Sequence, residues 1–106
     1  MSANRRTATR HAVSITTKLS VSGSSEASED CKMVNLSLGG AQVVATQKLP
    51  MGSRCQIGFR IPTLEELIEV GATVRWADDQ GTGLQFDGLR ARDVWGLNEF
   101  FKQLAP

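Results

Sequence analysis

Apolar and polar side chains alternate along most of this chain, and that period of two restricts it to extended, half-buried strands. Residues 11–21 read HAVSITTKLSV, with Val13, Ile15 and Leu19 at odd positions and small or polar residues at the even ones. Comparable segments follow at residues 31–38, 39–46, 54–61, 66–77 and 82–87. Polar stretches such as SGSSEASED and DDQG separate several of them and favour turns. The sequence therefore predicts five or six antiparallel strands.

The same alternation predicts which side chains face the core. It divides residues 31–38 into an inner face of Val34, Leu36 and Leu38 and an outer face of Met33, Asn35 and Ser37. In residues 66–77, Trp76 shares its parity with Val74. A position in the core or at its rim is therefore favoured for Trp76 over an exposed surface on which a base stacks.

The period changes near the end of the chain. Apolar residues recur there every three or four positions, at Val94, Leu97, Phe101 and Leu104, which predicts one amphipathic helix. Gly96 weakens that helix by about 1 kcal/mol relative to alanine, so we expect the helix to depend on docking. Strands followed by a single helix in 106 residues indicate one all-β domain, a small closed or nearly closed barrel capped by the helix.

The net charge of +1 conceals an uneven distribution. Residues 1–25 contain four basic residues and no acidic one, whereas the rest of the chain contains eight basic and eleven acidic residues. Proteins that bind long nucleic acids usually spread basic groups over a face or a stripe. Positive charge concentrated at one end of the chain suits binding of a compact anion better than binding of a long polyanion. The alternative is that this basic segment binds nothing and only aids solubility.

Cysteine and histidine usage argues against metal chemistry and catalysis. Cys31 and Cys55 form no CxxC pair, and His11 is the single histidine, so no zinc set with recognisable spacing can be assembled. Both cysteines fall in strand-like segments, where a buried thiol packs well. No nucleophile or carboxylate has a visible link to His11. We therefore expect no enzyme activity, no metal and no cofactor.

Targeting signals of the usual kinds are missing from the sequence. It shows no secretory leader at its beginning, and no apolar run approaches the roughly 18 residues of a membrane span. The sequence predicts a cytoplasmic protein without membrane insertion.

Two short motifs carry the candidate chemistry. Arg6 and Arg10 form an R-x-x-x-R pair just before the first strand, and Asn35, Ser37 and Gly40 form N-x-S-x-x-G between the second and third strands. With RTATR, NLSLGG, the later segment GTGLQF and the closing helix, the chain resembles the PilZ domain, a bacterial receptor family for the second messenger cyclic di-GMP. The resemblance covers nearly the whole chain, and the two motifs in this order are specific together although each is weak alone.

The resemblance implies a six-stranded antiparallel β-barrel with a C-terminal helix and a site for cyclic di-GMP. Arg6 and Arg10 would bind phosphate oxygens or a guanine edge and stack on a base, as the planar guanidinium allows. Asn35 and Ser37 would donate and accept hydrogen bonds at a guanine, and Gly40 would leave room for the ligand. Asn35 stands where the family often has aspartate, and an amide offers one acceptor oxygen where a carboxylate offers two.

The resemblance also implies a division of the chain. Residues 1–11 would form a flexible basic arm that closes over the nucleotide, and residues 12–106 would form the barrel, with its helix at about 90–104. Arg5 would contact the ligand as well, or a second nucleotide if the ligand binds as an intercalated dimer; a solvated side chain is the alternative for Arg5.

We therefore expect a sensor and adaptor that binds cyclic di-GMP, orders its arm and passes the change to an unidentified effector protein. A PilZ-like adaptor that binds proteins but no nucleotide is the alternative. A small basic-tailed barrel that binds RNA or DNA is disfavoured, because the chain has no tyrosine and only six aromatic residues, several of which the core needs.

Overall fold

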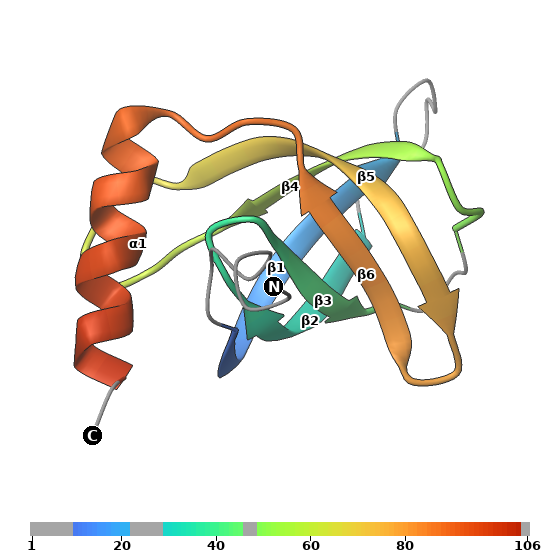
Figure 1. The fold of residues 1–106 in the computed structure, drawn as a ribbon, viewed down its shortest axis with the longest axis horizontal. Coiled ribbons are helices and arrows are strands. Elements are labelled where there is room, and N and C mark those ends of the chain that lie inside the picture. Colours follow the sequence, from blue (N-terminus) through green and yellow to red (C-terminus); the bar gives the residue numbers. More distant parts are fainter. Residues whose placement is uncertain (1–9, 22–28, 46–48, 105–106) are drawn as a thin grey trace, which may run out of the picture.

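The computed structural model describes residues 10–21, 29–45 and 49–104 and contains six strands followed by one helix. The elements are β1 (His11–Val21), β2 (Glu29–Leu36), β3 (Gly40–Val44), β4 (Arg54–Phe59), β5 (Ile68–Asp78), β6 (Gly81–Phe86) and α1 (Ala91–Leu104). All neighbouring strands pair antiparallel, in the closed order β1-β2-β3-β6-β5-β4 (Figure 1). This architecture confirms the predicted all-β barrel with a C-terminal helix.

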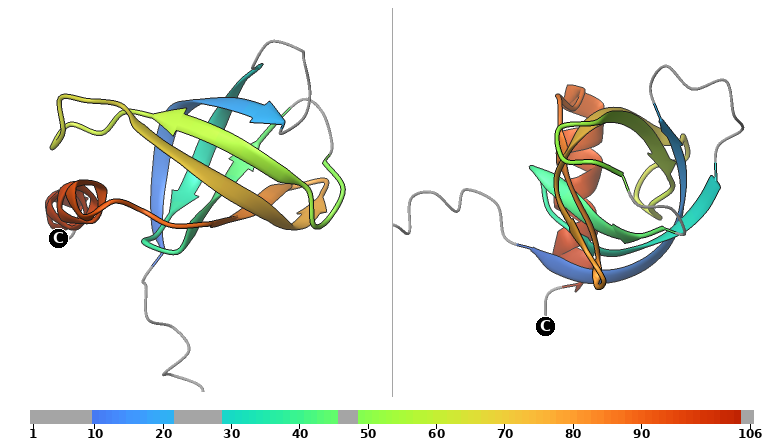
Figure 2. Two further views of the ribbon diagram at one scale, coloured as in Figure 1. Left: turned by 90° about the horizontal axis from the view of Figure 1, so that it is seen from above. Right: turned by 90° about the vertical axis from the view of Figure 1, so that its right-hand side faces the viewer.

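The core fills the inside of the barrel, and α1 lies at one end of it (Figure 2). Alternating side chains of β4 and β5 face inward as predicted, because each of these strands buries one face. From α1, Leu97 and Phe100 are buried. The predicted helical stripe is wrong at its end, because Leu104 is 41% exposed while Phe100 takes the inner position.

The start of α1 is fixed by the buried carboxylate of Asp93, which is 1% exposed. It accepts hydrogen bonds from the backbone N–H and the Nε of Arg90 at 3.4 and 3.3 Å, and so satisfies a donor at the open first turn. Further along, the connection between β4 and β5 crosses the helix at Gly96. A Cβ on Gly96 would overlap the side chain of Leu64, and Thr63 Oγ1 donates to the Gly96 carbonyl at 2.6 Å. Gly96, which lowers the intrinsic stability of the helix, is therefore also the residue at which the helix packs against the β4–β5 connection.

An extra residue at Val34 interrupts the alternation of β2. Met33 and Asn35 are two steps apart on β2, but their partners on β3 are adjacent, which defines a β-bulge. Met33 is fully buried and Val34 only half-buried, while Leu36 returns to the core. The prediction that Met33 faces outward and Val34 inward is wrong, because the bulge reverses the alternation between Met33 and Leu36.

Burial of Cys55 couples stability to alkaline pH. Desolvation, and secondarily the charge of Asp87, raises the pKa of the Cys55 thiol from 9.0 to about 11. Because the unfolded chain loses this proton first, the stabilisation is full below about pH 9 and falls as the pH rises toward about 11. We expect Cys55→Val to flatten this alkaline loss in thermal unfolding measured from about pH 8 to about 11. Cys31→Val, which leaves Cys55 in place, should retain it, and identical profiles for Cys55→Val and the wild type would contradict the assignment.

No helix among residues 91–104, the one helical segment described, is long and apolar enough to cross a membrane.

Candidate functional site

The register between β1 and β2 brings the two sequence motifs to one place. His11, the first residue of β1, pairs with Leu36, the last residue of β2. Arg10 therefore precedes β1 beside Ser37, which begins the turn into β3, and the two segments meet at the end of the barrel near α1 (Figures 1 and 2). Arg10 is exposed, while Arg5 and Arg6 lie outside the described residues.

The hydroxyl of Ser37 organises the turn between β2 and β3. Its Oγ accepts hydrogen bonds from the N–H groups of Gly39 and Gly40 at 3.1 and 3.2 Å and lies 3.3 Å from the Gly40 carbonyl oxygen, to which it can donate. The backbone N–H of Ser37 donates to that same carbonyl at 2.9 Å. The side chain is 8% exposed, so Ser37 is buried rather than on the open outer face that strand parity predicts. Its direct contact with a ligand stays a prediction.

Gly40 is required by the packing of the sheet. It pairs with Gln85 of β6, and a Cβ at Gly40 would overlap the carbonyl oxygen of Leu84. A Cβ at the adjacent Gly39 would meet nothing closer than Ser37 Oγ at 3.9 Å. The glycine of the N-x-S-x-x-G motif therefore permits the close approach of β3 and β6, whatever it contributes to a ligand.

One line of paired residues runs across five strands on the outside of the barrel. The pairs are Ala12 with Asn35, Asn35 with Gln42, Gln42 with Gly83, and Gly83 with Trp76. We call these five residues the outer row. Its side chains are exposed at Ala12 and half-buried at Asn35, Gln42 and Trp76. The row begins two residues after Arg10, so it forms a broad surface beside the start of the barrel.

Asn35 holds an unused acceptor in the outer row. The bulge at Val34 turns its side chain away from the core, yet its Oδ1 is buried and has no hydrogen-bond partner among the described residues. A buried amide oxygen without a donor costs free energy, and such groups are rare in folded proteins. The atom is available to a ligand that carries an N–H or O–H group.

Trp76 lies at the other end of the outer row, and strand parity did not predict the direction of its side chain. Val74 and Trp76 are two steps apart on β5, but their partners on β6 are adjacent, so Arg75 forms a second bulge. The indole lies against the outer side of Gly83, where a Cβ would overlap it. Of the two predicted positions, in the core or at its rim, the core is wrong because this bulge turns the side chain outward, where it is half-buried. The sequence signal for this position was Gly83, because a glycine inside a strand often marks a place where another group packs closely against the backbone.

An aromatic contact links the start of β1 to the helix. The rings of His11 and Phe101 are stacked, with centroids 4.1 Å apart and an interplanar angle of 16°. His11 directly follows Arg10, so the start of β1 next to Arg10 is in contact with the surface of α1.

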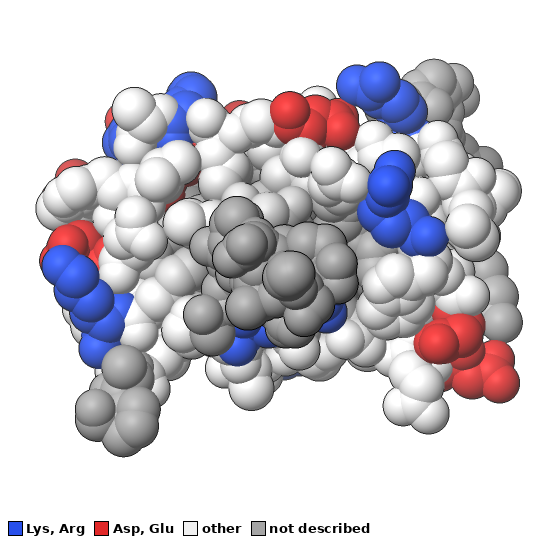
Figure 3. Space-filling view, viewed as in Figure 1, with Lys and Arg blue, Asp and Glu red and all other residues white. Residues whose placement is uncertain are grey.

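The site contains hydrogen-bonding and stacking groups. On the face in Figure 3, basic side chains of the described residues occur at separate places among acidic and uncharged ones, rather than as a continuous stripe. No group of three or more metal-ligating side chains occurs within residues 10–21, 29–45 and 49–104. An unpartnered amide oxygen, an indole and a nearby arginine suit recognition of a flat, polar, anionic ligand.

Two solved structures share this fold. The Bacillus subtilis inhibitor of motility MotI/DgrA aligns with a TM-score of 0.71 and 18% identity over 95% of this chain, which spans 54% of that protein. The PilZ domain of CeSA from a cellulose-synthesising bacterium aligns with a TM-score of 0.68 and 16% identity over 90% of this chain and 97% of that domain. No curated protein sequence matches significantly. The family model for the PilZ domain matches residues 4–103, and the chain therefore belongs to the PilZ domain family, whose members are generally receptors and adaptors for cyclic di-GMP rather than enzymes.

Proposed function

We propose that this protein is a cytoplasmic sensor that binds cyclic di-GMP between a basic arm, residues 1–11, and the outer row. One observation carries the proposal: the pairing of His11 with Leu36 sets the root of the arm beside the turn that contains Ser37. An arm attached there needs to bend over only a few residues to reach Asn35. Membership of the PilZ family supports the choice of ligand.

The chemistry of the ligand matches the groups available. Guanine carries N–H groups on its pairing edge, and the unpartnered Oδ1 of Asn35 can accept a hydrogen bond from them. Guanine also carries the acceptors O6 and N7, to which one arginine guanidinium can donate two hydrogen bonds. The two phosphates carry negative charge that Arg5, Arg6 and Arg10 would neutralise. A base lying along the outer row would approach the indole of Trp76, where stacking contributes about 1–3 kcal/mol.

Ser37 and Gly40 contribute through the turn between β2 and β3. The hydrogen bonds of Ser37 Oγ hold the backbone of Gly39 and Gly40, and this fixes the path by which β2 enters β3. The same turn keeps Asn35 in register with Gln42. In the proposal, these two motif residues hold the surface in shape, and any direct bond from Ser37 adds to that.

Output passes through a partner protein in this proposal. Ordering of the arm changes the surface around Arg10 and the contact between His11 and Phe101, which an effector protein on this end of the barrel can read. The change in surface, rather than any reaction, is the signal.

Titration calorimetry with cyclic di-GMP tests the proposal. We expect a dissociation constant in the roughly micromolar to submicromolar range. Trp95→Phe replaces an indole that is 58% exposed on α1, which leaves Trp76 as the fluorescence reporter, and its emission should change on binding. Cyclic di-AMP and a mixed-sequence oligonucleotide are the competitors, and neither should displace the ligand. Absence of heat and of a fluorescence change at about 100 micromolar cyclic di-GMP would contradict the proposal and favour an adaptor that binds proteins alone.

Asn35→Ala should separate binding from stability. Loss of its acceptor leaves guanine N–H groups without a partner, so we expect affinity for cyclic di-GMP to fall about tenfold. Folding stability should stay the same or rise slightly, because the variant removes a buried oxygen that has no donor. Urea denaturation and calorimetry measure the two effects. Gln56→Ala, which removes an exposed amide from β4, is the matched control and should change neither. A large loss of stability in Asn35→Ala would show that the amide serves the fold.

A further inference from the structure

The two halves of β1 differ on the side that faces β4. Its second half, from Thr17 to Val21, pairs with β4 from Phe59 back to Cys55. Its first half, residues 11–16, pairs with β2 but with no strand of the described residues on the β4 side. The register with β2 shifts between Ala12 and Ile15, where the strand bends. The barrel is closed by the second half of β1, and the first half has an unpaired edge, within the described residues, that we call the seam.

Burial along the inner face of β1 follows the same division. Thr17 and Leu19, which lie within the paired half, are 0% and 1% exposed. Val13 and Ile15 point to the same side of the strand, yet both are only half-buried. Part of their apolar surface is accessible, and no strand of residues 10–21, 29–45 or 49–104 pairs with β1 beside them on the β4 side.

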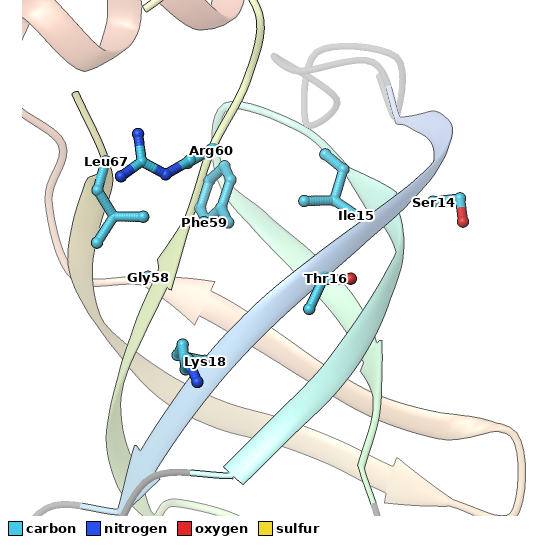
Figure 4. Close-up of a pocket in the computed structure, with 8 residues that line it drawn as sticks. All are labelled: Ser14, Ile15, Thr16, Lys18, Gly58, Phe59, Arg60 and Leu67. Carbon is cyan, nitrogen blue, oxygen red and sulfur yellow. The ribbon is translucent and has the colours of Figure 1, made fainter. Parts of the chain in front are cut away.

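The seam forms a groove of about 460 Å³ between β1 and the end of β4. Figure 4 shows Ile15 of β1 and Phe59 of β4 in the space between the two strands. Ser14 and Thr16 line its β1 edge, and Figure 4 shows the Ser14 side chain pointing to the far side of β1, where its hydroxyl accepts a hydrogen bond from Lys32 Nζ of β2 at 3.5 Å. The groove thus has an apolar floor and a polar edge of extended backbone, which suits an extended peptide better than a rounded ligand.

The charged side chains that line the groove are both basic. Lys18 pairs with Asp30 at 2.9 Å, but both side chains are more than 60% exposed, and such pairs contribute little and exchange easily. Arg60 donates one hydrogen bond, at 3.0 Å, to the backbone carbonyl of Glu65 and makes no ion pair with any residue the structure describes. Most of its donors are therefore available to a carboxylate.

The free edge lacks the usual protection against pairing. Natural edge strands are commonly guarded by proline, lysine or inward-pointing charge. Residues 11–16, HAVSIT, contain no proline, lysine or acidic residue and are rich in strand-forming types. Such an edge is suited to accept another strand.

We propose that the free half of β1 is a docking site for an extended segment of a partner protein, in which acidic residues alternate with apolar ones. The segment adds a strand beside Ser14–Thr16, places an apolar side chain against Ile15 and Phe59, and sets carboxylates near Lys18 and Arg60. This surface lies on the opposite edge of β1 from the outer row, and the proposal does not depend on nucleotide binding.

A blocked heptapeptide of alternating glutamate and valine, labelled with fluorescein, is the probe, and it is titrated without nucleotide. We expect saturable binding, with amide chemical-shift changes and slowed hydrogen exchange confined to residues 13–17 and 59–61. Two versions of the peptide, N-methylated at the valines or at the glutamates, test strand pairing. Because alternate N–H groups of a strand face the same neighbour, one version should bind about as well as the parent and the other at least about tenfold more weakly. Equal binding of both versions, or no binding at about 1 mM peptide, would overturn the proposal.

Charge reversal tests the partner's chemistry. Arg60→Glu should weaken the acidic peptide about fivefold and strengthen a lysine–valine version, since an exposed attraction becomes a repulsion. Arg75→Glu reverses another exposed arginine, which does not line the groove, and is the matched control. An equal loss of peptide affinity in the two variants would overturn the proposal, because the effect would then come from the net charge of the protein and not from the groove. The hydrogen exchange of residues 13–17 is also measured without peptide at several protein concentrations. Slower exchange at higher protein concentration would overturn the proposal, because a second copy of this chain would then occupy the edge.

Discussion

Gly40→Ala is expected to lower the free energy of unfolding by more than about 3 kcal/mol, a large part of the stability of a small domain. The added Cβ would overlap the carbonyl oxygen of Leu84, and backbone cannot move aside as a flexible side chain can. To relieve the overlap, β3 must separate from β6, which breaks the pairing of Gly40 with Gln85 and opens the barrel. Urea denaturation followed by circular dichroism measures the effect.

Gly39→Ala is the matched control for this prediction. The two glycines are adjacent in the same turn, but a Cβ at Gly39 would only approach Ser37 Oγ at 3.9 Å, which is ordinary contact. We expect Gly39→Ala to unfold within about 0.5 kcal/mol of the wild type. If Gly40→Ala instead folded normally and lost only nucleotide binding, the glycine would serve the ligand and not the sheet.

Arg10→Ala and Arg6→Ala are each expected to weaken cyclic di-GMP binding by about 2–4 kcal/mol, a factor of roughly 30 to 1,000 in the dissociation constant. Each variant leaves a phosphate or a guanine edge of the bound ligand without its charged donor. Stability should not change for Arg10→Ala, because the side chain is exposed. Calorimetry with each variant measures the loss.

Arg60→Ala is the control for the arginine variants. It removes an exposed arginine that follows β4 and lines the groove, away from the outer row. Nucleotide affinity should stay within about twofold of the wild type. Unchanged binding in Arg10→Ala would contradict the role of the arm, even if the protein binds the nucleotide. Arg60→Ala and Arg10→Ala together separate the two surfaces, because only Arg60 belongs to the groove.

The first half of β1 would then serve two partners, one at each edge. On the β2 edge, Ala12 belongs to the outer row, and on the β4 edge Ser14 and Ile15 line the groove. His11 begins this half and stacks on Phe101 of α1. If both proposals hold, ordering of the arm at Arg10 would act on a strand whose other edge is unpaired among the described residues, and this would be a short route from the nucleotide to the partner.

Much of the fold was contained in the sequence. The alternation through Ile57, Phe59, Val70 and Val74 identified the inner faces of β4 and β5, because a strand that buries one face must show that period. The change of period at Val94 identified the helix. The two motifs are brought together where Arg10 precedes β1 beside the β2–β3 turn, and their residues remain the predicted ligand contacts.

The alternation placed Asn35 correctly on the outer face, but the inward orientation of Met33 and the outward orientation of Trp76 were decided by the tertiary structure. Met33 lies next to the bulge at Val34 and Trp76 next to the bulge at Arg75, and a bulge exists only relative to the register of the neighbouring strand. The periodicity of one strand contains no information about that register. It can predict that a strand has two faces, but packing with its partners decides where the faces exchange.

The requirement for Gly40 and the open seam beside Ile15 were also decided by distant parts of the chain. Gly40 is needed because Leu84, far along the sequence, approaches it in the closed barrel. The seam exists because β4 stops pairing at Thr17 while β1 continues back to His11. The sequence by itself determined the local period, the strands, the helix and the motifs. Closure of the barrel determined which backbones touch and which edge stays free, since both depend on contacts between residues far apart in the chain.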